Sequence, residues 1–148
     1  MRWFRANAAR YRIDPDRIVL MGSSASAINV LNVNFAPEDA GNSGHPGYSS
    51  AVAAAIAVSG TDTEPQNIDM NESPIAMFHA ADDQTIPIEA AMATCTQTQE
   101  MGNVCEFFRY ETGGHPPGFL IEYRAQITEQ ASGFICRYVM PGVCHGIS

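Results

Sequence analysis

Apolar runs and helical spacings alternate along the chain. Apolar runs with the length of buried strands lie at residues 17–21, 54–59, 75–79 and 104–110. Helix-like segments lie at residues 24–35 and 88–101, and apolar residues in steps of three and four define one helical face from Leu120 to Tyr138. This alternation predicts an α/β domain in which about four mainly parallel strands are flanked by helices.

The remaining segments carry weaker patterns. Near the N-terminus, Phe4, Ala8 and Tyr11 have helical spacing, and a polar turn at residues 13–16 ends that helix. Glycine, proline, asparagine and serine dominate residues 37–50, which predicts a long surface loop. No internal repeat interrupts the pattern, so we expect residues 1–148 to form a single domain.

Composition and charge exclude several kinds of partner. The 148 residues are 45% hydrophobic and carry a formal charge of -8, with eight arginines and no lysine. A strongly acidic chain repels phosphate backbones, so nucleic acid is not an expected partner. The longest apolar stretch, at residues 51–58, is far shorter than the roughly 20 residues of a membrane span. Because the first residues also lack the apolar core of a signal peptide, we expect a soluble protein.

Four cysteines, Cys95, Cys105, Cys136 and Cys144, leave two interpretations open. Their spacing matches no CxxC or Cys/His zinc pattern, so we expect no metal site. Local disulfides from Cys95 to Cys105 and from Cys136 to Cys144 would suit an oxidising compartment, whereas free buried thiols would suit a cytosolic protein. If the cysteines pair, a secreted or periplasmic location is expected.

The strongest chemical signal lies where the strand at residues 17–21 meets the next helix. There the sequence Gly22-Ser23-Ser24-Ala25-Ser26 has the Gly-x-Ser-x-small pattern of a nucleophile elbow. Such a turn lifts one serine hydroxyl out of the backbone, beside the N-terminus of a helix. Ser24 is therefore the candidate nucleophile, and Ser23 and Ser26 are expected to be packing residues.

Candidate partners for Ser24 follow two later strands. Asp82 and Asp83 come after the strand at residues 75–79, and the carboxyl end of a parallel strand is where α/β sheets place their chemistry. His115 lies in a Gly/Pro-rich loop directly after the last apolar run. A serine hydroxyl needs such a base within about 2.6–3.2 Å before it becomes a nucleophile. The order Ser, Asp, His along the chain is that of the α/β-hydrolases.

These motifs resemble the C-terminal half of an α/β-hydrolase of the carboxylesterase type, and essentially the whole chain takes part in the resemblance. The family pattern His-Gly-x-x-Asp-x-x-Val-Pro is matched with two conservative changes at residues 79–87, and it selects the second of the two aspartates, Asp83. The family's Gly-Gly-His loop is matched at residues 113–115. The helix at residues 3–11 and the Ile-Asp-Pro-Asp-Arg-Ile turn at residues 13–18 also resemble the segment that precedes the family's elbow.

The resemblance implies a catalytic triad. His115 would accept the proton of Ser24 and then protonate the leaving alcohol, and Asp83 would hold the imidazole in the required tautomer. The backbone N–H of Ala25 would supply one oxyanion-hole donor, which is worth roughly 2.7–4 kcal/mol in comparable sites. The implied activity is hydrolysis of small or short-acyl carboxylic esters through an acyl-enzyme, with no cofactor.

The chain also departs from the family. Ser26 stands where the elbow usually ends in glycine, so a slightly wider or shifted turn is expected. Nothing before the first helix matches the family's N-terminal strands or its Gly-rich oxyanion loop, so the expected fold is a truncated α/β-hydrolase fold. The strand at residues 17–21 would then be an open apolar edge, which natural proteins pair or cover. We therefore expect a homo-oligomer or a missing N-terminal segment over that strand.

Two other functions are compatible with the sequence. A catalytically inactive hydrolase-like module would bind a partner through the open strand edge and the loop at residues 37–50. A peptidase of related fold is the other, because ester and amide cleavage use the same triad.

Overall fold

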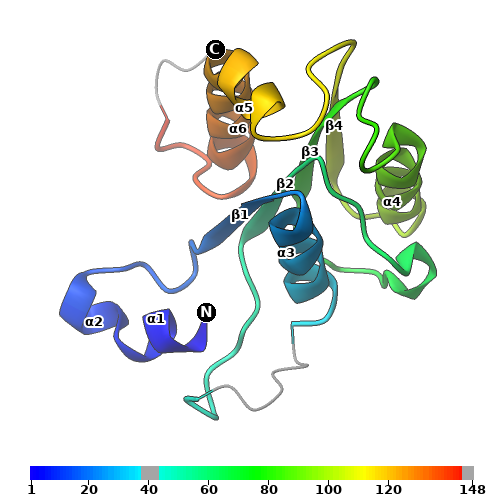
Figure 1. The fold of residues 1–148 in the computed structure, drawn as a ribbon. Coiled ribbons are helices and arrows are strands. Elements are labelled where there is room, and N and C mark those ends of the chain that lie inside the picture. Colours follow the sequence, from blue (N-terminus) through cyan, green and yellow to red (C-terminus); the bar gives the residue numbers. More distant parts are fainter. Residues whose placement is uncertain (38–43, 145–148) are drawn as a thin grey trace.

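The strands of the sheet follow one another in space as they do in sequence. The computed structural model describes residues 1–37 and 44–144. Its parallel sheet has the order β1 (Val19–Ser23), β2 (Ala54–Val58), β3 (Ile75–Ala80) and β4 (Cys105–Tyr110). Helices α3 (Ala25–Phe35) and α4 (Ile88–Glu100) cover one face, and α5 (Gly118–Glu122) and α6 (Arg124–Tyr138) cover the other (Figure 1). The predicted α/β class and the parallel sheet are confirmed.

The two middle strands are buried on both sides, which explains their continuous apolar runs. Successive side chains of a strand point to opposite faces of the sheet. In β2, Ala54, Ile56 and Val58 belong to the apolar cluster formed with α5 and α6. Ala55 and Ala57 belong to the cluster formed with α3 and α4. The sheet therefore provides a rigid base for the loops at its carboxyl edge.

β1 is an edge strand within the described part of the chain. It pairs in parallel with β2, and the other described strands lie beyond β2. Met21, at the centre of β1, is 54% exposed. The strand begins two residues later than the predicted 17–21, at Val19, where its pairing with Ala54 of β2 begins. The expected open edge is present among the described residues.

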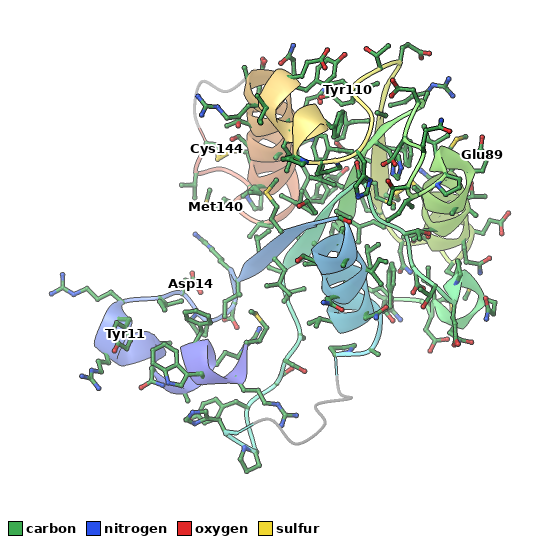
Figure 2. All side chains as sticks on the ribbon, viewed as in Figure 1. Tyr11, Asp14, Glu89, Tyr110, Met140 and Cys144 are labelled. Atoms are coloured by element: carbon green, nitrogen blue, oxygen red, sulfur yellow. A yellow bond between two sulfur atoms is a disulfide. The ribbon has the colours of Figure 1, made fainter. Side chains whose placement is uncertain are left out.

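The single helix predicted at residues 3–11 is two short helices, α1 (Arg2–Ala6) and α2 (Ala8–Tyr11). They break at Asn7, whose side-chain amide donates a hydrogen bond to the carbonyl of Trp3 at 2.8 Å. Neither helix buries a residue, and Tyr11 is 50% exposed. Both helices lie apart from the layers around the sheet (Figures 1 and 2). Their thin apolar face has no layer of the described residues to pack against.

The closing helical segment is also divided. α5 and α6 meet at Tyr123, whose φ of -104° and ψ of 17° fall outside the helical region. The Tyr123 ring packs against the rings of Tyr110 and Phe119, with centroid distances of 4.5 and 5.5 Å. Its hydroxyl lies 3.0 Å from that of Thr112. We attribute the break to this aromatic cluster, which ties α5 and α6 to the end of β4 at Tyr110 (Figure 2).

The loop predicted at residues 37–50 is partly described, since residues 38–43 lie outside the described residues. From residue 44 to residue 53 the backbone forms turns and irregular segments. The Arg5 guanidinium donates a hydrogen bond to the carbonyl of Ser49 at 2.9 Å, which joins this segment to α1. The described part of the loop agrees with the prediction.

The described helices do not reach the length of a membrane span. The longest of them, α6, has 15 residues. Within residues 1–37 and 44–144, none of the helices combines the length and the apolar character needed to cross a bilayer.

Both local disulfides are formed. Cys95 of α4 pairs with Cys105 at the start of β4, and Cys136 of α6 pairs with Cys144. The first bond ties a covering helix to the sheet at a buried position, since Cys95 and Cys105 are only 4% and 7% exposed. Disulfides form and persist in oxidising compartments. The pairing favours the disulfide interpretation over free thiols, and a secreted or periplasmic location stays a prediction.

Candidate active site

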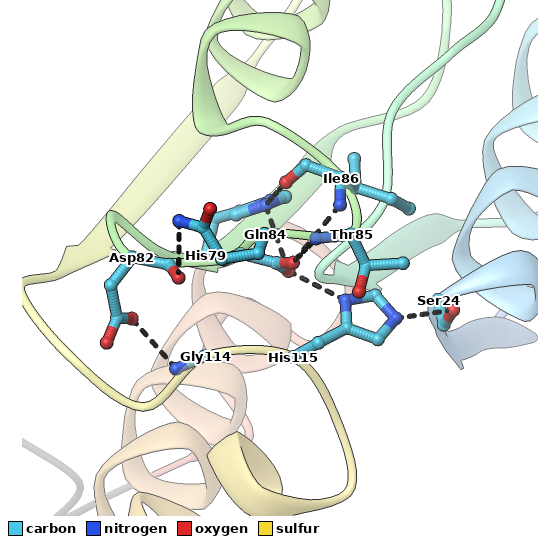
Figure 3. A network of polar contacts seen from close by, with 9 residues as sticks. Ser24, His79, Asp82, Gln84, Thr85, Ile86, Gly114 and His115 are labelled. Atoms are coloured by element: carbon cyan, nitrogen blue, oxygen red, sulfur yellow. Dashed lines mark hydrogen bonds and ion pairs between the residues drawn. The ribbon is translucent and has the colours of Figure 1, made fainter.

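Ser24 lies in a strained turn between β1 and α3. Its φ of 54° and ψ of -126° place it in a region that residues with a side chain rarely adopt. The Ser24 N–H donates a hydrogen bond to the carbonyl of Val58 at 2.9 Å, which ties the turn to the end of β2. The turn directs the Ser24 side chain toward the loops that follow β3 and β4 (Figure 3).

Gly22 permits the close approach of strand and helix that this turn requires. A Cβ atom on Gly22 would collide with the carbonyl of Ser26 and the amide of Ala27, so only glycine fits. Ser26 is exposed, and the close contact falls on its backbone. The slightly wider or shifted turn stays a prediction. The expectation that Ser26 is a packing residue was wrong, because its side chain faces solvent.

His115 connects Ser24 to Asp83. His115 lies in the loop after β4 and Asp83 in the loop after β3, and these two strands are neighbours in the sheet. The Ser24 hydroxyl donates a hydrogen bond to His115 Nε2 at 2.7 Å, and His115 Nδ1–H donates to Asp83 Oδ2 at 2.7 Å (Figure 3). The structure thus brings together the three residues that the sequence singled out as nucleophile, base and orienting acid.

These hydrogen bonds determine the tautomer of the imidazole. An ionised Asp83 only accepts hydrogen bonds, so Nδ1 of His115 carries the proton of the bond between them. Nε2 then presents its lone pair to the Ser24 hydroxyl. This is the tautomer in which a histidine is able to take a proton from serine.

Asp83 is held as a buried anion. It is 5% exposed, and this burial is the largest influence on its pKa and acts to raise it. Hydrogen bonds from His115 and from the amides of Ile86 and Thr85 together outweigh burial, so the pKa lies below its ordinary value of 3.8. The two amides donate to Oδ1 at 3.1 and 2.8 Å, which leaves Oδ2 for His115. Asp83 is therefore charged at neutral pH and fixed in orientation.

Asp82 contacts the same loop at a different point. Its Oδ1 accepts a hydrogen bond from the backbone N–H of Gly114 at 2.8 Å (Figure 3). Asp82 is exposed, whereas Asp83 is buried beneath the imidazole. The two neighbouring aspartates thus bind the backbone and the side chain of neighbouring residues, Gly114 and His115.

His79 is a residue of the site that had no predicted role, although it ends the apolar run at residues 75–79 and is the first residue of the matched pattern at residues 79–87. It is 1% exposed, and its Nε2–H donates a hydrogen bond to the carbonyl of Ile86 at 2.9 Å. The same nitrogen lies 3.5 Å from Asp83 Oδ2. His79 therefore braces the loop that carries Asp83. Its spacing of four residues from Asp83 was visible, but the turn that brings Ile86 back over its ring was not.

Comparison with known proteins identifies the fold. No protein-family model matches the chain, and no curated protein matches its sequence. Esterase 2 of the planctomycete Thermogutta terrifontis, with propionate bound, aligns with a TM-score of 0.84 and 21% identity over 97% of this chain and 64% of the esterase chain. The same esterase phosphoramylated by tabun aligns with a TM-score of 0.81 and 24% identity, over 97% of this chain and 63% of its own. The chain thus shares the fold of these esterases, which is the predicted α/β-hydrolase fold.

A second enzyme also aligns with this chain over the same fold. It is an acetyl ester-xyloside bifunctional hydrolase from Caldicellulosiruptor lactoaceticus, with a TM-score of 0.79 and 16% identity over 95% of this chain and 64% of that enzyme. The chain thus spans less than two thirds of the length of these hydrolases. The predicted partial α/β-hydrolase fold is confirmed, with four parallel strands among the described residues. At these identities the likeness establishes the fold alone.

Ala25 is the first residue of α3 in this α/β-hydrolase elbow. The first N–H groups of a helix have no acceptor within the helix, so they are available to an anion near the N-terminus. Ala25 is exposed and directly follows Ser24. Its predicted role as an oxyanion-hole donor stays a prediction.

The candidate site is open to solvent. The His115 side chain is 18% exposed, and Ser24 is partly exposed beside it. A cavity of about 520 Å³ lies elsewhere, near the C-terminal end of α3, where Asn32 and Asp62 line it. Its lining includes neither Ser24 nor His115, so this cavity does not belong to the site.

Burial of His79 predicts a pH-dependent stability of this chain. Burial is the largest influence on the His79 pKa, and it outweighs the hydrogen bond to Ile86 and the charge of Asp83, so the pKa lies below its ordinary value of 6.5. Below pH 6.5 the unfolded chain binds a proton that the folded chain does not. The contribution of neutral His79 to the free energy of unfolding should therefore be fully present above this pH. Below it, the free energy of unfolding should fall by at most about 1.4 kcal/mol per pH unit for one proton.

We expect His79→Gln to lose this part of the pH dependence. A glutamine amide is still able to donate to the Ile86 carbonyl but does not titrate. Urea unfolding between about pH 5.5 and 7.5 would measure the slope in both proteins. The matched control is His45→Asn, which should keep the wild-type slope because His45 is exposed. Equal slopes for the wild type and His79→Gln would contradict the prediction.

Proposed function

We propose that this chain is a serine hydrolase that cleaves carboxylic esters through an acyl-enzyme intermediate. The observation that carries the proposal is the pair of 2.7 Å hydrogen bonds that joins Ser24, His115 and Asp83 in order. Ser24 would be the nucleophile, His115 the general base and acid, and Asp83 the residue that orients the imidazole. The esterases among the structural neighbours support this assignment.

In the first half of the reaction, His115 Nε2 takes the hydroxyl proton as Ser24 Oγ attacks the ester carbonyl. The tetrahedral intermediate then collapses, and its C–O bond to the alcohol breaks. The imidazolium gives its proton to the leaving alcohol, which leaves Ser24 acylated and His115 neutral. Between these two proton transfers, the buried anion of Asp83 stabilises the imidazolium.

In the second half, water replaces the alcohol. His115 takes a proton from the water as its oxygen attacks the acyl carbon, and the bond to Ser24 Oγ breaks. The imidazolium returns its proton to Ser24, and the carboxylic acid leaves. The Ala25 N–H would donate to the oxyanion in both halves, a contribution of roughly 2.7–4 kcal/mol in comparable sites.

We propose small or short-acyl esters as the substrate class. Thermogutta esterase 2 is known with propionate and with butyrate bound. The Caldicellulosiruptor enzyme is named an acetyl ester hydrolase. These names support p-nitrophenyl acetate and butyrate as the first substrates to test. Faster hydrolysis of a long-chain ester than of either would contradict the proposed class.

Labelling with a fluorophosphonate tests the hydrolase function, because the reagent reacts with a serine that a neighbouring base activates. Thermogutta esterase 2 is phosphonylated by sarin, a reagent of the same chemical class. We expect one label per folded chain, on the peptide that contains Ser24, and no label on Ser24→Ala or on urea-denatured wild type. Folded protein that takes no label would overturn the hydrolase function and favour an inactive module that binds a partner.

We further propose that the edge of β1 is covered in the active protein. Met21 is 54% exposed on this edge, and Trp3 of α1, earlier in the chain, is 45% exposed. The chain spans only 64% of Thermogutta esterase 2, which leaves room for further strands beside β1. The occupant would be a second copy of this chain or a complementary segment of the hydrolase fold.

Size-exclusion chromatography with light scattering tests whether β1 is covered by another copy. We expect a mass above the 16.0 kDa of one chain for the fraction that hydrolyses p-nitrophenyl acetate. An active monomer that is stable in solution would contradict covering by a second chain. A monomer without activity would support a complementary segment as the occupant.

A further inference from the structure

The loops after β3 and β4 are joined by hydrogen bonds at three successive residues of the first loop, from Ala81 to Asp83. The N–H of Ala81 donates a hydrogen bond to the carbonyl of Tyr110 at 2.7 Å, which continues the pairing of the two strands. One residue further, the Asp82 carboxylate accepts from the Gly114 N–H at 2.8 Å. The bond between Asp83 and His115 follows directly. Asp82 therefore holds the residue that immediately precedes the histidine.

The backbone of the loop that carries His115 contains two glycines, so a contact that restrains it matters. Gly113 and Gly114 have φ values of 123° and 60°, and glycine backbones have the largest conformational freedom of any residue. At Gly113 the backbone passes close to the rings of Phe119 and Tyr123, which a Cβ atom there would meet. At Gly114 a Cβ atom would meet nothing within 4 Å. The hydrogen bond to Asp82 is thus what joins the Gly114 backbone to the neighbouring loop.

The geometry points to Asp82 as a positioning residue for His115, an inference that rests on the proposed hydrolase function. The bond from Nδ1 to Asp83 fixes one atom of the imidazole, but the ring still pivots about that atom if its backbone moves. Holding Gly114 removes this motion and keeps Nε2 within 2.7 Å of the Ser24 hydroxyl. A displacement of 1 Å in a catalytic group costs on the order of 100-fold in rate. Because Asp82 is exposed and water competes for its bond, we expect a smaller loss, of about tenfold.

Two substitutions separate the hydrogen bond from the charge. Asp82→Ala removes both, whereas Asp82→Asn keeps an oxygen that accepts from the Gly114 N–H. We expect kcat for p-nitrophenyl acetate to fall about tenfold in Asp82→Ala with KM unchanged, because the proposed role of Asp82 acts through the Gly114 backbone on His115 and not on substrate binding. Asp82→Asn should recover most of the wild-type kcat.

The rates must be expressed per active site, which fluorophosphonate labelling counts. A role in folding alone would reduce the number of labelled chains but leave kcat per labelled chain unchanged. A positioning role lowers kcat per labelled chain and slows labelling, while the final labelled fraction stays that of the wild type. This readout therefore distinguishes positioning from a general loss of structure.

Each remaining outcome decides against the inference. Wild-type kcat per labelled site in Asp82→Ala would overturn it and leave the hydrolase function intact. An Asp82→Asn variant as slow as Asp82→Ala would overturn it too, because the charge and not the hydrogen bond to Gly114 would then matter. If the wild type itself takes no label at Ser24, the proposed function fails and the role of Asp82 fails with it.

Discussion

Ser24→Ala is expected to lower kcat/KM for p-nitrophenyl acetate by at least about 10⁴-fold. The substitution removes the oxygen that attacks the ester, so no acyl-enzyme forms at this turn. The turn itself should persist, because the hydrogen bond of residue 24 to Val58 comes from the backbone N–H, which alanine retains. Initial rates of p-nitrophenol release, corrected for the uncatalysed reaction, would measure the loss.

The matched control for this variant is Ser26→Ala. Ser26 lies in the same turn, but its side chain faces solvent and takes no part in the bonds to His115. We expect its kcat/KM to stay within about twofold of the wild type, since exposed side chains away from the chemistry contribute little. If Ser24→Ala kept more than about a tenth of the activity while folded, Ser24 would not be the nucleophile.

The apolar pattern predicted the sheet because burial on both faces leaves a clear signal. The run at residues 75–79 lies within β3, whose six residues are all buried. β1 was less well placed, with a shift of two residues from the predicted 17–21. Its side chains are partly exposed at the edge, and an apolar pattern reports burial and not where strand pairing begins and ends.

The helices were predicted as continuous where the structure divides them. The spacing of apolar residues continues across both Asn7 and Tyr123, because it reports which face is buried. The breaks arise from other contacts, a side-chain amide on a backbone carbonyl at Asn7 and an aromatic cluster around Tyr123. The cluster joins residues that are distant in sequence, so no local pattern contains it.

The three candidate catalytic residues were more predictable than the residues that hold them in place. Ser24, Asp83 and His115 each follow a strand in a recognisable turn, and the parallel sheet brings these turns to one edge. The bracing by His79 depends on the turn that brings Ile86 back to its ring. The bond of Asp82 to Gly114 depends on the register of β3 against β4, which places Ala80 beside Tyr110. Register is set by packing between strands and is not visible in either strand alone.

Asp83→Asn should lower kcat for p-nitrophenyl acetate by about 10⁴-fold. The asparagine oxygen would keep the bonds from the amides of Thr85 and Ile86, so its NH₂ group would face His115. Two donors cannot share a hydrogen bond, so the imidazole must move its proton from Nδ1 to Nε2. Nε2 would then present N–H to the Ser24 hydroxyl and would no longer take its proton.

The same substitution at two other aspartates shows whether this loss belongs to Asp83. Asp82→Asn keeps the acceptor for Gly114, so its kcat should fall by no more than about threefold. Asp69→Asn, on the exposed surface before β3, controls for the loss of one negative charge and should leave kcat unchanged. Because asparagine has nearly the shape of aspartate, kcat per fluorophosphonate-labelled chain compares the three variants directly. A large loss of kcat in Asp82→Asn, together with an active Asp83→Asn, would assign the orienting role to Asp82. The 2.7 Å hydrogen bond from His115 to Asp83 would then not be required for catalysis.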